Sequence, residues 1–322
     1  MTDLSDGLAG FGEPSPPAPD GLALPRDFDA TYGRGLGHTL SLGGGGLFFV
    51  AWQVTYLFEM AQRGIELSGS ERVVGTSAGS VVASVLGAGN IGRLHKEIGV
   101  LAKWPRLVAA LAPAEDLNPS QNRALEVFAL AADAEPDTIR AIGHAALAAQ
   151  TPGANVIPRN LTAILASRGW PAPELHITCM DAYTGERCVV TFAAGVRTAR
   201  AVAASSAVPG LFAPQPILGR RCMDGGVSGT GLHLDLLAGS RRAVVLGLTD
   251  GAGVEEGMMT AHPGSIVEEL DALRASGTDV FFRMPESMDV LRLMDPTAVP
   301  EAMAMARRQA ATDAEELRDF WS

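Results

Sequence analysis

The hydrophobic pattern of the chain changes period several times, and each change predicts an element. Residues 38–42 form a short strand-like run, and residues 47–63 then carry apolar side chains three and four positions apart. This order predicts a buried strand followed by a helix that ends near Gly64, with Gln53 off its apolar face. A second run, Val73-Val74, precedes another helix-compatible segment. Strand, helix and strand in succession predict a βαβ unit, and therefore a parallel sheet at this point.

Helical spacing dominates residues 90–160, where prolines interrupt successive apolar repeats. This segment is either a helical cap inserted over a functional site or the outer helical layer of the sheet. Later apolar runs predict further strands and hairpins, and two more helices. The strands fall at residues 174–180, 188–192, 217–218, 221–223, 243–248 and 280–282, and the helices at residues 198–208 and at the C-terminus.

Composition separates the N-terminal residues from the rest of the chain. Of the 322 residues, 47% are hydrophobic and 19% are charged, which is typical of a compact globular protein. Residues 1–36, however, contain repeated prolines among glycine, alanine and aspartate, and they are too poor in apolar side chains to order themselves. We therefore expect a flexible arm over residues 1–36 and one folded domain over residues 37–322.

Charge and cysteine usage narrow the possible partners and compartment. The net charge of -11, from 25 basic and 36 acidic residues, argues against nucleic-acid binding and against electrostatic docking on anionic lipid. Three cysteines without Cys-x-x-Cys spacing fit buried thiols in a reducing compartment. No apolar run reaches the roughly 18 residues of a membrane span, and the first residues lack the features of a signal peptide. We expect a soluble cytoplasmic protein whose contact with membranes, if any, is transient.

The best candidate for chemistry is a short turn centred on Ser77. The sequence Gly75-Thr76-Ser77-Ala78-Gly79 follows the apolar pair at residues 73–74 and has the Gly-x-Ser-x-Gly form of a nucleophile elbow. Small residues on both sides would expose the serine hydroxyl at the end of a strand and direct the next helix N-terminus toward it. In a chain with 37 glycines, the pentapeptide alone is equally compatible with a structural turn.

A run of four glycines, residues 43–46, stands between the first predicted strand and helix. A dinucleotide-binding loop needs Gly-x-Gly-x-x-Gly, and Phe49 occupies the position of the third glycine. An oxyanion hole fits better, because glycines allow several N–H groups to converge beside a helix N-terminus. A glycine-rich turn without a ligand is the remaining alternative.

A serine nucleophile needs a base, and the sequence leaves two possibilities. Of the six histidines, only His233 and His262 lie in loops that could support catalysis, and Ser77, Asp224 and either of them would have the chain order of an α/β-hydrolase triad. Alternatively, Asp224 is itself the base, because Gly225-Gly226 would leave its carboxylate uncovered at a strand end. Asp-Gly-Gly is also a common turn.

Four stretches of the chain together resemble the patatin-like phospholipase family, and they occur in the order typical of that family. They are residues 42–46, 75–80, 204–210 and 223–227. The resemblance implies a three-layer α/β/α fold with a mostly parallel central sheet, and a Ser–Asp dyad without histidine. It also implies an enzyme that hydrolyses acyl esters of lipids without a metal or another cofactor.

The resemblance assigns a role to each matching residue. Ser77 would be the nucleophile and Asp224 the general base, and an acyl-enzyme would form on Ser77. Backbone N–H groups would bind the oxyanion, and further glycines would shape the two turns. The proposed oxyanion donors are Gly44, Gly45, Gly46 and Ala78, and the supporting glycines are Gly75, Gly79, Gly225 and Gly226.

The chain departs from the family pattern directly after the glycines. The family motif commonly continues as Gly-Gly-Gly-x-Arg-Gly, whereas Phe48 and Phe49 occupy the last two positions here. The two rings could crowd the oxyanion hole or line an acyl pocket. A catalytically weak protein that binds lipid or acyl groups, and an enzyme that transfers the acyl group to an acceptor other than water, are therefore alternatives to a hydrolase.

Overall fold

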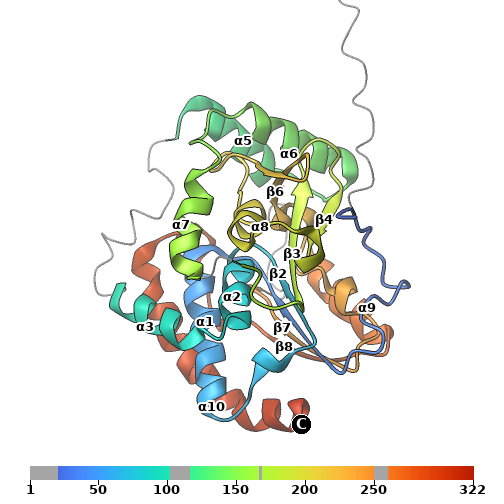
Figure 1. The fold of residues 1–322 in the computed structure, drawn as a ribbon, viewed down its shortest axis with the longest axis vertical. Helices are drawn as coiled ribbons and strands as arrows, with labels where there is room; N and C mark the ends of the chain where they lie inside the picture. The colour runs from blue at the N-terminus through green and yellow to red at the C-terminus, as the bar shows by residue number, and fades with distance from the viewer. Residues whose placement is uncertain (1–20, 102–116, 167–168, 250–259) are drawn as a thin grey trace, which may run out of the picture.

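The structure, a computed structural model, describes residues 21–101, 117–166, 169–249 and 260–322 (Figure 1). It confirms the predicted fold class, an α/β architecture in which helices cover a mixed, mostly parallel central sheet. Eight strands form the sheet in the order β5-β6-β3-β2-β1-β7-β8, and β4 pairs separately with β3. Their bounds are β1 His38–Leu42, β2 Arg72–Gly75, β3 Leu175–Asp181, β4 Arg187–Val190, β5 Gln215–Ile217, β6 Arg220–Asp224, β7 Arg242–Leu246 and β8 Asp279–Arg283.

Parallel pairing joins β3, β2, β1, β7 and β8, as the predicted βαβ unit requires. The strands β4 and β6 both run antiparallel to β3, and β5 forms a hairpin with β6. Alternate side chains of the central strands enter two different cores. In β1, for example, Leu40 and Leu42 pack with one helical layer, whereas Ser41 points the other way and donates to the Leu232 carbonyl.

The helices form the two outer layers of the molecule (Figure 1). The first apolar core joins the sheet to α1 Gly46–Gln62, α2 Ala78–Gly87, α8 Thr198–Ser205 and α10 Val299–Trp321. The opposite core contains α9 Ser265–Ala275 and the short 3-10 helix η5 Leu234–Leu237. Further short 3-10 helices are η2 Leu67–Gly69, η3 Phe192–Ala194, η4 Gly225–Ser228, η6 Val290–Arg292 and η7 Pro296–Ala298.

Four described helices lie between α2 and β3, in the segment that the sequence predicts to be helical. They are α3 Ile91–Leu101, α5 Pro119–Ala129, α6 Pro136–Ala148 and α7 Val156–Leu165. The α3 and α7 helices join the core around α1 and α8, whereas α5 and α6 pack on Met180 and Met223 in a small core of their own. The segment therefore combines an outer layer with a separate helical pair.

The prediction for the polar side of α1 is wrong at one residue. Gln53 is 0% exposed, although the local pattern places it off the apolar face. The side chain of Gln53 faces the end of β1, where its Nε2 donates to the Gly43 carbonyl. Helix α10 packs along α1 at other positions, where Trp52 donates to Gln309 and Tyr56 donates to Asp313. Nearly the whole circumference of α1 is therefore buried between Phe48 and Leu57.

Residues 21–36, which the composition assigns to a flexible arm, lie against the folded body. Leu22 is buried, and the Leu24 N–H donates to the Arg187 carbonyl. In return, the Arg187 guanidinium donates to the carbonyls of Leu24 and Pro25 and is paired with the buried Asp235. The rest of the predicted arm, residues 1–20, lies outside the described residues.

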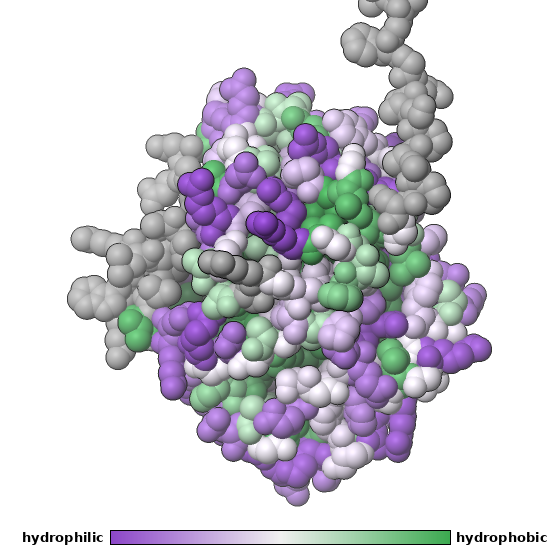
Figure 2. All heavy atoms as spheres, in the orientation of Figure 1, coloured by the Kyte–Doolittle hydropathy of each residue, from purple (hydrophilic) through white to green (hydrophobic). Residues whose placement is uncertain are grey.

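The surface is mixed in polarity. Figure 2 shows hydrophilic side chains spread over the visible face, with separate apolar patches between them. Within the described ranges, no helix is both long enough and apolar enough to cross a bilayer.

Candidate active site

The serine turn joins the end of β2 to the start of α2. Ser77 adopts φ 51° and ψ −118°, a conformation that is unusual for a residue with a side chain. The flanking glycines permit it, because a Cβ on Gly79 would lie 1.9 Å from the Leu42 carbonyl oxygen and a Cβ on Gly75 would lie 2.7 Å from Ser80 Cα. The elbow geometry thus depends on close backbone contact that only glycine allows.

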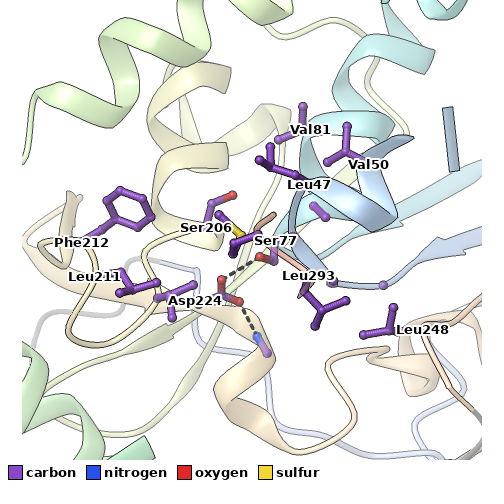
Figure 3. Close-up of a pocket in the computed structure, with 18 of the residues that line it drawn as sticks. Leu47, Val50, Ser77, Val81, Ser206, Leu211, Phe212, Asp224, Leu248 and Leu293 are labelled. Carbon is purple, nitrogen blue, oxygen red and sulfur yellow. Dashed lines mark hydrogen bonds between the residues drawn. The ribbon is translucent and has the colours of Figure 1, made fainter. Parts of the chain in front are cut away.

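The structure places Ser77 and Asp224 in direct contact. Ser77 Oγ donates a hydrogen bond of 2.7 Å to Asp224 Oδ2, and the Gly226 N–H donates one of 2.8 Å to Asp224 Oδ1. Figure 3 shows both bonds at the centre of the pocket. Both carboxylate oxygens are therefore fixed, one by the backbone and one by the serine hydroxyl.

The register of the sheet explains how residues 147 positions apart meet. Strand β3 lies between β2 and β6, with Ile177 opposite Gly75 and Cys179 opposite Asp224. Asp224 therefore lies two residues beyond the end of β2, at the level of Ser77. Because β6 is antiparallel to β3, it reaches this level at its own C-terminal end.

The environment of Asp224 favours its neutral form. The side chain is only 4% exposed, and burial raises the pKa of its carboxyl to about 6. The hydrogen bonds from the Gly226 N–H and the Ser77 hydroxyl stabilise the carboxylate and lower the pKa, but their effect is smaller. A carboxylate with this pKa is ionised at neutral pH and is a stronger base than an ordinary aspartate.

Two further contacts, which sequence analysis did not assign to the site, support the elbow. The Ser77 N–H donates a 2.8 Å hydrogen bond to Ser205 Oγ at the end of α8, and Ser205 is fully buried. The hydroxyls of Thr76 and Thr178 lie 2.7 Å apart and link the turn to β3. Ser205 lies in residues 204–210, one of the four stretches that resemble the family, and this resemblance could have identified it as part of the site.

The glycine run lies beside the serine. A Cβ on Gly44 would be 3.1 Å from Ser77 Cβ and 3.8 Å from Ser77 Oγ, and Gly46 begins α1 with φ 63°. Considering only the described part of the chain, the N–H groups of Gly44, Gly45, Gly46 and Ala78 donate to no protein acceptor. All four residues line the same cavity as Ser77. These N–H groups are thus available to a ligand, as an oxyanion hole requires.

Phe48 and Phe49 do not line the cavity, so the prediction of their role in an acyl pocket is wrong. Both rings are buried in the core, at 4% and 0% exposure, and Phe49 stacks on Trp52 with the ring centres 5.4 Å apart. The helical twist of α1 turns these positions away from the cavity. Leu47 and Val50, on the other side of the helix, line the cavity instead.

No histidine contacts the dyad among the residues that the structure describes. His233 is fully buried, its Nε2 lies 3.3 Å from Ser228 Oγ, and burial lowers its pKa well below the usual value. His262 lines the outer part of the cavity, where its Nδ1 lies 3.0 Å from the Pro263 carbonyl oxygen. The geometry therefore brings Ser77 together with Asp224 and with neither imidazole.

A cavity of about 680 Å³ opens at Ser77. Its walls come from α1, α2, α3, α5 and α7 and from the loop after α8. Figure 3 shows Leu47, Val50 and Val81 on one side of the dyad and Leu211 and Phe212 on the other. Over the described ranges, no group of three or more histidine, cysteine or acidic side chains could hold a metal ion.

Comparison with known proteins gives a family and two similar folds. The sequence profile of patatin-like phospholipases matches residues 40–234, more than half of the chain. A search of curated proteins finds no match to this chain. The type III effector protein ExoU is 18% identical, with a TM-score of 0.36, over 87% of this chain and 53% of ExoU. VipD from Legionella pneumophila is 13% identical, with a TM-score of 0.34, over 89% of this chain and 68% of VipD. The chain spans about half the length of ExoU.

Proposed function

Because this chain belongs to the patatin-like phospholipase family, we propose that it hydrolyses carboxylic esters of lipids through an acyl-enzyme on Ser77. The observation that carries the mechanism is the 2.7 Å hydrogen bond from Ser77 Oγ to Asp224 Oδ2. A hydroxyl that donates directly to a buried carboxylate can lose its proton as it attacks, without an intermediate histidine.

The reaction proceeds in two halves. Ser77 Oγ attacks the ester carbonyl carbon while its proton passes to Asp224 Oδ2, and the tetrahedral intermediate collapses when Asp224 returns that proton to the leaving alkoxide. A water molecule then gives its proton to Asp224 and attacks the acyl carbon. Collapse of the second intermediate returns the proton to Ser77 Oγ and releases the carboxylic acid.

The oxyanion of each intermediate is assigned to the N–H groups around Ser77 that have no acceptor within the described ranges. The donors are those of Gly44, Gly45 and Gly46, with Ala78 at the start of α2 as a further donor. The positive N-terminal ends of α1 and α2 meet at the same place, and they stabilise negative charge there. Backbone donors of this kind need no reorganisation during the reaction.

The apolar cavity favours a substrate with a hydrocarbon chain. It begins at the nucleophile and is walled mainly by aliphatic side chains such as Leu47, Val81 and Leu211. Burial of methylene groups contributes about 0.8 kcal/mol each, so a long acyl chain gains most from this cavity. We therefore assign the cavity to the acyl group of a lipid ester.

The central experiment compares wild type with Ser77→Ala and Asp224→Asn on p-nitrophenyl esters and a panel of lipid esters, together with labelling by a fluorophosphonate probe. Each substitution should lower kcat by about 10⁴-fold or more, because each removes a member of the acyl-transfer machinery. Wild type should be labelled at Ser77, and Ser77→Ala should not. Wild type that binds fatty acid but is neither labelled nor active would identify an acyl-binding protein instead.

Histidine substitutions and acceptor competition separate the remaining alternatives. His262→Ala and His233→Gln should retain most of the activity, since neither imidazole hydrogen-bonds to the dyad in the described structure. A loss as large as that of Ser77→Ala would replace the dyad by a triad. If added alcohols or amines capture the acyl group faster than water does, the protein is an acyltransferase.

A further inference from the structure

Gln53 is a polar side chain in an apolar position. It lies on α1 with 0% exposure, between Trp52 and Val54 of the main core. Its Nε2 donates a hydrogen bond of 3.2 Å to the Gly43 carbonyl oxygen, and its Oε1 has no hydrogen-bond partner among the described residues. A buried acceptor left unpaired costs about 1–3 kcal/mol, and a leucine or methionine would avoid this cost.

The identity of the contacting atom follows from chemistry. A backbone carbonyl only accepts hydrogen bonds, so the amide nitrogen of Gln53, and not its oxygen, must face Gly43. The unpaired atom is then the oxygen. Among the described residues, this side chain therefore makes one hydrogen bond, and that bond is to the peptide that enters the glycine run.

The Gly43–Gly44 peptide is held at its carbonyl, which accepts the hydrogen bond from Gln53. The preceding peptide is fixed too, because the Gly43 N–H donates to the Leu246 carbonyl at 3.0 Å. The Gly43 carbonyl also needs the space left by Gly79, where a Cβ would lie 2.8 Å from it. These contacts fix the plane of the peptide and direct its oxygen into the protein interior.

The consequence falls on Gly44. In a trans peptide the C=O and the following N–H point in opposite directions, so the Gly44 N–H points away from Gln53. Gly44 is the glycine beside Ser77, and its N–H has no protein acceptor in the described part of the chain. A rotation of this peptide would turn the N–H away from the position of the oxyanion.

We infer that Gln53 is a positioning residue: it locks the Gly43–Gly44 peptide so that the Gly44 N–H is presented to the oxyanion formed at Ser77. This inference rests on the proposed function, since it assigns a role within that reaction. The substrate does not touch Gln53, which acts only through the backbone. The amide supplies a hydrogen-bond donor that an apolar side chain could not supply, and its oxygen is left without a partner among the described residues.

The test uses Gln53→Met, which keeps the length of the side chain and removes the donor. Deleting one oxyanion donor typically lowers kcat 10²–10³-fold, so a loosened donor should lower it by about 10-fold or more. The KM for a p-nitrophenyl ester and the Kd for fatty acid should stay within about twofold of wild type, because ground-state binding is untouched. Thr55→Val is the matched control, since Thr55 is equally buried on α1 and its hydroxyl has no partner in the described chain.

A second variant keeps the test decisive if Gln53→Met does not fold. In Gln53→Glu the protonated side chain can donate to the Gly43 carbonyl, but the ionised one cannot. Its kcat, taken as a ratio to wild type at each pH, should therefore fall as pH rises, whereas a Gln53→Met ratio should not change.

The outcomes separate this inference from the proposed function. A folded Gln53→Met with wild-type kcat, or a Gln53→Glu ratio that is flat with pH, overturns the role of Gln53 while Ser77→Ala remains inactive. If Ser77→Ala is as active as wild type, the proposed function itself fails. A parallel rise in KM and fatty-acid Kd would indicate a merely structural role.

Discussion

Asp224 is held in a state that suits a base and opposes folding. Its carboxyl is buried, yet only the Gly226 N–H and the Ser77 hydroxyl hydrogen-bond to it, and no cation pairs with it in the described structure. Burial without a cation makes the charged form costly and raises the pKa to about 6. This raised pKa should affect both the pH dependence of kcat/KM and the pH dependence of the free energy of unfolding.

The pH dependence of kcat/KM should report this carboxyl. Asp224 accepts the serine proton only when it is ionised, so activity should be lost as pH falls through about 6 and should level off above it. Below that value, kcat/KM should fall about tenfold per pH unit. Measuring kcat/KM from pH 4.5 to 8, with an ester that does not hydrolyse spontaneously in this range, would test this dependence. An inflection near 7 that disappears in His262→Ala would instead indicate a catalytic histidine.

Asp224→Asn should raise stability at neutral pH while it abolishes turnover. The carboxyl has a pKa of about 6 in the fold against an ordinary value of 3.8, so the folded state binds its proton more tightly and loses stability as pH rises through 6. Asparagine avoids the buried charge, and the gain above pH 7 should approach about 3 kcal/mol. Urea denaturation of both proteins at pH 8 and pH 4.5 tests this. The difference in the free energy of unfolding between the two proteins should be smaller at pH 4.5 than at pH 8. A difference that does not change with pH would contradict the buried charge of Asp224 as its cause.

At the scale of elements, local patterns located the strands and most helices, but they missed α9 Ser265–Ala275 and did not show which elements are neighbours. Residues 38–42 and the helix after them were predictable, because the first segment has the short apolar run of a buried strand and the second has apolar residues at helical spacing. The burial of Gln53 was not, since it depends on a contact between its amide and the Gly43 carbonyl that helical periodicity does not encode. The antiparallel placement of β6, which delivers Asp224, also depends on pairing that no local pattern encodes.

The contact between α2 and β1 gives a prediction at this scale. A Cβ on Gly79 would lie 1.9 Å from the Leu42 carbonyl oxygen, which is backbone and cannot yield without moving the sheet. Gly79→Ala should therefore destabilise the protein by about 1–3 kcal/mol or more and shift the elbow. Gly87→Ala, where the nearest atom is a side-chain carbon at 3.1 Å, is the control at the other end of α2 and should cost less. Thermal unfolding and fluorophosphonate labelling would measure both effects.

At the scale of the whole molecule, the cavity is assembled from distant segments. The sequence offered a helical cap over residues 90–160 as one of two alternatives, but it did not identify the individual residues of the walls. Phe48 and Phe49 were assigned to the pocket because they adjoin the glycine run, but the twist of α1 turns both rings into the core. The motifs of the dyad could be found because each is a contiguous stretch. The walls include residues of α3, α5, α7 and the loop after α8, and nothing local marks such residues as lining a shared space.

Those walls should set the preferred acyl length, and Ile98 on α3 offers a test. Its half-buried side chain lines the cavity, so Ile98→Trp should shorten the space between α3 and the nucleophile. A misfit of this kind costs about 1–3 kcal/mol, so kcat/KM for laurate and palmitate esters should fall at least 10-fold. Butyrate esters should be hydrolysed as before, because they do not reach α3.

The matched control for Ile98→Trp is Val267→Trp, an exposed position on α9, in the helical layer on the opposite side of the sheet. It introduces the same indole ring at a residue that does not line the cavity, so its chain-length profile should be that of wild type. If Ile98→Trp lowers kcat/KM equally for butyrate, laurate and palmitate esters, the acyl chain does not extend toward α3. The lobe beside Leu211 and Phe212 would then be the acyl site, because it is the other apolar wall that begins at Ser77.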